Sequence, residues 1–283
     1  MIVIVLVPLK MFHLPRTTTD WIMFFIFWLG GLWTLFYEYY FIMCSYHKDW
    51  NSYVIFHVAV AGFLALSIYT NMILIISSDV TTRSVSLSAV LPSDKWKYCD
   101  ICQLSAPPRS HHCKLCNACI LKRDHHCWFA GYCIGFSNHR YFICLAFYMS
   151  IAGVYANIYN WDFFLSVKGG FTWTTLPSLI APHVGLMFGT YTFYEFFITI
   201  VSSTGFLVTI VFLWLLETQI LQFVKGQVMH EKKKGINDYS LGLSNTFNEI
   251  FGSAGFWVFL CPLVRTKLPG DGTSFLTRDD KEK

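Results

Sequence analysis

Seven of the ten cysteines lie between Cys99 and Cys133, and short, regular gaps separate them. A two-residue gap between cysteines lets both thiolates point at one tetrahedral zinc ion, and three successive pairs with nearby histidines are far stronger evidence than one pair. Two zinc ions need eight ligands. Six thiolates and two histidines would supply them, the thiolates being those of Cys99, Cys102, Cys113, Cys116, Cys119 and Cys133. One cysteine and one histidine of Asp124-His125-His126-Cys127 are then left over.

This surplus pair indicates chemistry, because a closed structural zinc site has no use for it. An imidazole beside a thiol can take its proton, and the resulting thiolate is the attacking form. A carboxylate on the other ring nitrogen would hold the tautomer. Residues one or two apart do not face each other on a helix, so we expect Asp124, His125 and Cys127 to meet on a turn. The zinc ions would hold this helix-poor loop rigid and take no chemical part.

The elements that must position this loop are membrane helices. The chain is 54% apolar and only 13% charged, whereas soluble domains carry about 25% charged residues. A net charge of +4 without a basic patch interleaved with aromatics excludes a nucleic-acid partner. The apolar Met1–Leu9 run is too short to span and is a poor signal peptide. Four stretches can cross a bilayer as helices, namely Trp21–Cys44, Ser52–Ile76, Tyr141–Trp161 and Phe196–Leu216.

The distribution of positive charge sets the orientation. Of the 21 Lys and Arg residues, only Lys48 and Lys168 lie in the first and third connections. Positive charge accumulates on the cytosolic side, so both termini and the cysteine-rich connection are expected there. A fifth uncharged stretch, 171–191, would place Lys232–Lys234 on the wrong side, and we interpret it as re-entrant or interfacial. The stretch 255–264 is too short to span and is expected to lie against the membrane or pack on the spans from the cytosolic side.

These expectations give an α-helical membrane protein with a cytosolic double-zinc domain between helices 2 and 3. The predicted parts are a cytosolic N-terminal arm (1–20), transmembrane helices 1 and 2 (21–77), the cysteine-rich zinc domain (78–140), helices 3 and 4 with the lumenal re-entrant or interfacial segment (141–221), and a cytosolic tail (222–283).

The cysteine run resembles the cysteine-rich domain of the DHHC family of protein palmitoyltransferases, named after the four residues that stand here at 124–127. The resemblance includes every cysteine spacing, the segments Ala106–Ser110 and Cys133–Phe142, and the four-span layout. The chain departs from the family pattern at Phe129 (usually Trp), Tyr132 (usually Asn), Val228-Met229 (usually Thr-Thr) and Asp79-Val80-Thr81 (usually Asp-Pro-Gly).

The resemblance implies an activity and a role for each residue of the run. Cys127 would be the acylated nucleophile, His125 its base and Asp124 the orienting carboxylate. The reaction would move a fatty acyl group from palmitoyl-CoA to cysteines of substrate proteins at the cytosolic face of an endoplasmic reticulum or Golgi membrane, with room for an accessory subunit. One zinc would take Cys99, Cys102, His112 and Cys119, and the other would take Cys113, Cys116, His126 and Cys133.

Coenzyme A carries several phosphates, for which Arg109, Lys122, Arg123 and Arg140 are candidate ligands. The competing explanation for these cations is positive-inside charge that faces anionic headgroups. Two other functions remain open at this stage. The first alternative to the enzyme is a catalytically silent zinc-binding membrane adaptor, and the departures near Cys127 are its best support. The second is a transporter or channel, which ranks last because charges are almost absent from the middle of the spans.

Overall fold

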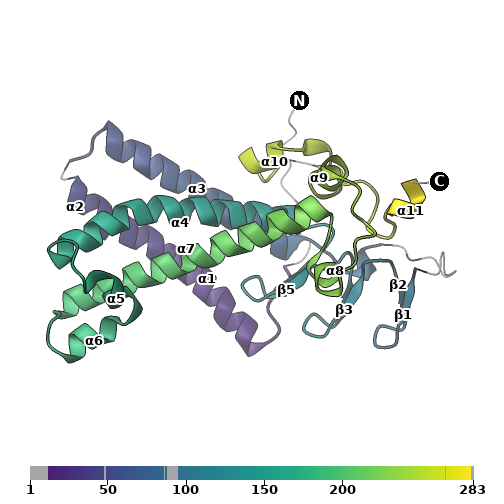
Figure 1. Ribbon diagram of the computed structural model, residues 1–283. Helices are drawn as coiled ribbons and strands as arrows, with labels where there is room; N and C mark the ends of the chain where they lie inside the picture. Colours follow the sequence, from purple (N-terminus) through teal and green to yellow (C-terminus); the bar gives the residue numbers. More distant parts are fainter. Residues whose placement is uncertain (1–11, 48, 86, 88–94, 265, 282–283) are drawn as a thin grey trace. The chain divides into compact units, whose positions relative to one another are not determined.

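A computed structural model describes residues 12–47, 49–85, 87, 95–264 and 266–281 (Figure 1). The Met1–Leu9 run lies outside the described residues. Among the described residues, four helical segments are long and apolar enough to cross a membrane, as predicted: Thr18–Tyr46, Ser52–Ser77, His139–Lys168 and Phe193–Lys225. The first consists of α1 (Thr18–Tyr37), a π-helical stretch (Glu38–Met43) and α2 (Cys44–Tyr46), and the others are α3, α4 and α7. Helices that are apolar all round are typical of membrane spans.

The chain divides into two compact units. The first takes in the chain up to Gly31, Leu66–Leu145 and Glu217 onward, and the second takes in Leu32–Ala65 and Ala146–Leu216. The first unit therefore contains the start of α1, the end of α3, the start of α4 and the end of α7, together with the cysteine-rich connection and the tail. Spans of alternating direction bring these four ends together.

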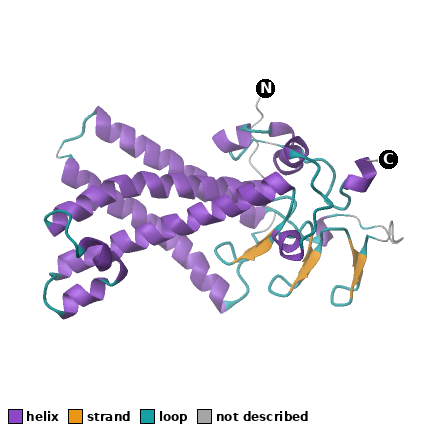
Figure 2. Cartoon of the chain, viewed as in Figure 1, coloured by secondary structure: helices purple, strands orange, loops and turns teal. Residues whose placement is uncertain are grey.

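The cysteine-rich connection is built from three small antiparallel hairpins (orange in Figure 2). They follow a short 3₁₀ turn (Thr82–Ser84) and pair β1 (Lys97–Cys99) with β2 (Leu104–Ala106), β3 (His111–Cys113) with β4 (Ala118–Ile120), and β5 (His125–Cys127) with β6 (Tyr132–Ile134). The described residues 95–138 contain no α-helix, as the sequence predicts. Isolated two-stranded hairpins are only marginally stable in water, so these hairpins need stabilising cross-links beyond their own strand pairing.

The C-terminal tail consists of short helices in the first unit. These are α8 (Met229–Lys234), α9 (Leu243–Phe251), a 3₁₀ turn (Gly252–Ala254), α10 (Trp257–Leu260) and α11 (Arg278–Lys281). Helix α9 is amphipathic and buries Ile250 and Phe251. Large apolar side chains around α10, such as Phe256 and Trp257, are exposed. That the stretch 255–264 lies against a membrane stays a prediction.

In the second unit, buried apolar side chains of the first span, α4 and α7 pack together, namely Tyr37, Ile42, Phe163, Phe164 and Ile198. The one carboxylate of the first predicted span, Glu38, is partnered there, since Asn160 Nδ2 donates to it at 2.6 Å. The connection between α4 and α7 forms two short helices, α5 (Thr175–Ile180) and α6 (Pro182–Met187), and among the described residues it is not a candidate span. Its re-entrant or interfacial position stays a prediction.

Candidate active site and metal centres

In the part of the chain that the structure describes, two clusters of cysteine and histidine have the geometry of metal sites, and both have the predicted membership. Cluster 1 is Cys99, Cys102, His112 and Cys119, and cluster 2 is Cys113, Cys116, His126 and Cys133. Within each, the four ligand atoms lie within 4.8 Å of one another. Donors of one tetrahedral zinc ion are roughly 3.3–3.8 Å apart, given Zn–S near 2.3 Å and Zn–N near 2.0 Å. The Cys102 Sγ to His112 Nδ1 distance is 3.2 Å, and the Cys116 and Cys133 Sγ atoms are 3.5 Å apart. The donor sets fit one such ion each.

The hairpin register explains how each cluster forms. In the second hairpin His112 lies opposite Cys119, and in the third His126 lies opposite Cys133. Each of these cross-strand pairs is completed by two cysteines from the preceding hairpin. A metal ion in cluster 1 would therefore join the first hairpin to the second, and one in cluster 2 would join the second to the third. This is the cross-linking that strands of three residues need.

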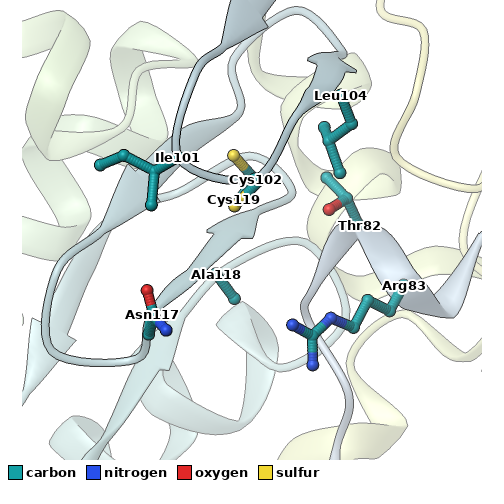
Figure 3. A pocket seen from close by; sticks show the side chains of 8 residues that line it. All are labelled: Thr82, Arg83, Ile101, Cys102, Leu104, Asn117, Ala118 and Cys119. Atoms are coloured by element: carbon teal, nitrogen blue, oxygen red, sulfur yellow. The ribbon is translucent and has the colours of Figure 1, made fainter.

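The two clusters differ in their surroundings. Three ligands of cluster 1 are only half-buried, and Cys102 and Cys119 line a cavity of about 170 Å³ together with Thr82 and Arg83 (Figure 3). Three ligands of cluster 2 are fully buried. Its histidine is also held from outside, because His126 Nε2 and the buried Asp20 Oδ1 lie 3.1 Å apart. Such outer contacts orient a ligand and strengthen metal binding.

The candidate catalytic residues lie on β5. Successive side chains of a strand point to opposite faces, so His125 and Cys127 share one face while His126 turns to cluster 2. The sequence argument excluded a helix and predicted a turn, whereas the structure has a strand at these residues. The strand achieves the same result through its two-residue period. Cys127 is buried and pairs across the hairpin with Tyr132.

Asp124 and His125 form the contact on which the chemistry depends. His125 Nδ1 and Asp124 Oδ2 are 2.7 Å apart. Burial lowers the pKa of His125, but the bond to Asp124 and the nearby Cys127 outweigh it and raise the pKa to about 9. Burial raises the pKa of Asp124, yet His125 and its other partners hold it well below its usual range. The His125 ring also packs edge-on against Phe142, at 4.7 Å between centroids. The imidazole is therefore fixed, basic and presented to the face that carries the thiol.

Two further residues hold Asp124 and a third holds one of these two, and the sequence did not indicate any of them. The Met229 backbone N–H donates to Asp124 Oδ1 at 2.6 Å, and Gln219 Nε2 donates to Asp124 Oδ2 at 3.3 Å. Gln219 Oε1 lies 2.8 Å from His139 Nε2. Met229 acts through its backbone as the first residue of α8, where helical N–H groups lack partners, so its side-chain type gives no signal. Gln219 and His139 would be detectable only as polar residues at the ends of apolar spans.

Two of the four cations predicted to bind coenzyme A belong to a buried ion-pair cluster. Arg109 donates to both carboxylate oxygens of Glu231, at 2.7 and 2.8 Å, and to Glu249 at 2.9 Å. Lys122 Nζ lies 2.7 Å from the same oxygen of Glu249. The cluster ties the cysteine-rich domain to α8 and α9, and the donors described here would have to be released before Arg109 could bind a phosphate. Its role in binding coenzyme A stays a prediction.

The other two predicted cations have donors to spare. Arg140 stacks on Tyr141 at 4.4 Å and donates to its hydroxyl at 2.8 Å, while its Nε and Nη1 atoms are buried without a partner in the described part of the chain. The Nε atom of Arg123 also lacks a partner among the described residues, although the Arg123 side chain interacts with Cys113 and Cys133 of cluster 2. Unsatisfied buried donors of this kind call for an explanation, and an anionic ligand is one.

Comparison with known proteins decides the family. A family model described as DHHC palmitoyltransferase matches residues 92–236. The chain belongs to the DHHC palmitoyltransferase family. DHHC relatives include the probable palmitoyltransferase ZDHHC24 of Danio rerio, 34% identical over 80% of this chain and 78% of that protein, and its Homo sapiens counterpart, 30% identical over 79% of each. The palmitoyltransferase ZDHHC20 of Bos taurus is 32% identical over 69% of this chain and 50% of its own length.

Proposed function

We propose that the protein is a protein S-acyltransferase that carries a fatty acyl group as a thioester on Cys127. The observation that supports this most strongly is the geometry of β5, which presents His125 and Cys127 on one face while Asp124 holds His125 Nδ1 at 2.7 Å. Membership of the DHHC family supports the same reaction. Palmitoyl-CoA is the proposed donor, and cysteines of other proteins are the proposed acceptors.

In the first step His125 Nε2 takes the proton from Cys127 Sγ. This nitrogen is free for the task because Nδ1 is engaged by Asp124. The thiolate attacks the thioester carbonyl of acyl-CoA, the carbon–sulfur bond to coenzyme A breaks, and the coenzyme A thiolate leaves with the proton from His125. Asp124 stabilises the imidazolium that exists between these two transfers.

The second step repeats the first with a new nucleophile. A substrate thiol gives its proton to His125 and attacks the acyl group on Cys127, and the Cys127 thiolate leaves and recovers the proton. Each step exchanges one thioester for another, so little net free energy is required. What the site supplies is a basic imidazole in a fixed position and a thiol held beside it.

The proposed zinc ions support this arrangement structurally. Each cluster offers four protein ligands, which closes a tetrahedral site and leaves no position for a substrate. For coenzyme A, Arg140 is the proposed phosphate ligand with the strongest support, since two of its donors are buried and have no partner among the described residues. The remaining candidates are Arg109, Lys122 and Arg123.

The proposed location is an endoplasmic reticulum or Golgi membrane, with the cysteine-rich domain and both termini in the cytosol. The Lys and Arg distribution supports this orientation. An accessory subunit is compatible with it.

The test is acyl labelling of the full chain in membranes with clickable palmitoyl-CoA. We compare the parent with Cys127→Ser and with Cys44→Ser, which removes an exposed thiol outside both clusters as a matched control. We expect hydroxylamine-labile label on the parent and on Cys44→Ser, and none on Cys127→Ser. Equal label on all three, or no label on a parent that holds its metal ions, would refute the transferase and leave a zinc-stabilised membrane adaptor.

A further inference from the structure

The residues that lead into α1 lie against the hairpin that carries Cys127. We call residues 13–20 the N-terminal strap. The His13 ring stacks on the Tyr132 ring, with centroids 4.1 Å apart and an angle of 6° between the planes. The strap is anchored at this point, since the His13 backbone N–H donates to the Ile76 carbonyl at the end of α3, at 2.9 Å. Tyr132 is the residue directly opposite Cys127 in the β5–β6 register.

Three more contacts follow along the strap. A Cβ atom added at Gly131 would lie 2.6 Å from Pro15 Cγ, so the β5–β6 loop and the strap are in close contact. Gly131 also has a φ of +59°, a conformation that disfavours other residues. Arg16 Nη1 donates to the Cys116 carbonyl at 2.6 Å, and Asp20 meets the cluster 2 ligand His126. The strap therefore touches the loop, the strand opposite Cys127 and the second metal site.

The hairpin needs this support at one end in particular. Cluster 2 holds the His126–Cys133 pair, but the next pair toward the loop, Cys127–Tyr132, contains no metal ligand. A two-stranded hairpin of this length has little stability of its own. The His13 ring, stacked on Tyr132, supports the Cys127–Tyr132 pair, which contains no metal ligand. Tyr132, one of the departures from the family pattern, supplies the flat ring that this stack requires.

We propose that the N-terminal strap positions Cys127 for acyl transfer, with His13 and Asp20 as positioning residues. His13 acts through Tyr132 on the strand pair that contains the nucleophile, and Asp20 acts through His126 on the neighbouring pair. Neither touches the reacting atoms in the proposed mechanism. The proposal rests on the proposed acyltransferase function and assigns part of its site to the start of the first span and the residues just before it.

The experiment compares full-length parent, His13→Ala, His13→Phe and Leu14→Ala in membranes. Leu14 is an exposed neighbour and serves as the matched control. For each protein we measure the maximal rate of Cys127 acylation, the KM for palmitoyl-CoA and the bound zinc. We expect His13→Ala to lower the maximal rate roughly two- to tenfold, the range that corresponds to the loss of one aromatic pair. KM and zinc content should not change, His13→Phe should restore the rate, and Leu14→Ala should match the parent.

Other outcomes separate the two proposals. A parent that acylates normally together with His13→Ala at the parental rate overturns the strap and leaves the acyltransferase intact. Loss of zinc in His13→Ala that His13→Phe does not restore also overturns it, because the contact would then serve folding alone. A parent that never acylates overturns both. If His13→Ala does not accumulate, His13→Leu keeps the bulk without the flat ring and should be slower than His13→Phe.

Discussion

Replacing Asp124 by asparagine removes the charge beside His125 and leaves the volume almost unchanged. The surroundings decide how the new amide must lie. One oxygen of Asp124 accepts from the Met229 N–H at 2.6 Å, and the other accepts from Gln219 at the longer distance of 3.3 Å. The amide oxygen of asparagine should therefore stay on Met229, since an NH₂ group there would meet a donor at short range. Its NH₂ group would then face His125 Nδ1.

This orientation reverses the tautomer of His125. An NH₂ donor at Nδ1 makes that nitrogen the acceptor and moves the ring proton to Nε2, which faces the thiol as a donor and no longer as a base. General-base catalysis contributes about 10²–10⁴ in rate. We therefore expect Asp124→Asn to slow acylation of Cys127 by about 10²–10⁴, or about 3–5 kcal/mol of barrier at 1.36 kcal/mol for each factor of ten.

The assay is single-turnover acylation of the full chain by labelled palmitoyl-CoA, with zinc measured on the same samples. Asp124 is not a member of either metal cluster, so the variant should keep two zinc ions per chain. Acylation within threefold of the parental rate, with zinc intact, would refute the role of Asp124 as the group that sets the tautomer.

Three further perturbations follow from the same contacts. Gln219→Ala removes a donor to Asp124 and the partner of His139, so the maximal acylation rate should fall roughly three- to tenfold at constant KM; an unchanged rate contradicts this. Glu249→Ala leaves Lys122 buried without its carboxylate and should lower the free energy of unfolding in detergent by about 3 kcal/mol. The exposed Asp279→Ala serves as the control, and equal stabilities would count against the ion-pair cluster. Zinc release to a chelator should have a fast phase from the half-buried cluster 1 and a slow phase from the buried cluster 2. Asp20→Ala removes the outer contact of His126 and should accelerate the slow phase about 10–100-fold. A single phase that the variant leaves unchanged would contradict this assignment.

The fold could be predicted because its determinants are local in the sequence. Long runs of apolar residues without breaks indicate membrane helices, and the structure extends each one beyond the predicted core, as with Phe193–Lys225 for the predicted Phe196–Leu216. The cysteine and histidine spacing likewise indicates two zinc sites, and the resemblance to the DHHC family assigns the ligand sets that the structure brings together. The gaps alone would not have assigned them, because Cys116 and Cys119 are separated by two residues and belong to different clusters.

The missed parts of the site depend on contacts between segments far apart in the sequence. Met229 lies 105 residues from Asp124, and Asp20 lies 106 residues from His126. No spacing rule connects such positions. For Arg109, contacts between distant segments likewise decide a property that the sequence does not show. Its type suggests a phosphate ligand, but whether its donors are available depends on Glu231 and Glu249, which α8 and α9 bring to it.

The most direct test of the central claim is to map the acyl group to a residue and follow it to an acceptor. The full chain is exposed briefly to palmitoyl-CoA, chased with a cysteine-containing peptide, and sampled by peptide mass spectrometry. We expect a palmitoyl group on the peptide that contains Cys127, and we expect it to disappear as the acceptor is acylated. A group that stays on Cys127 through the chase, or is found only on Cys44 or Cys261, would contradict the central claim.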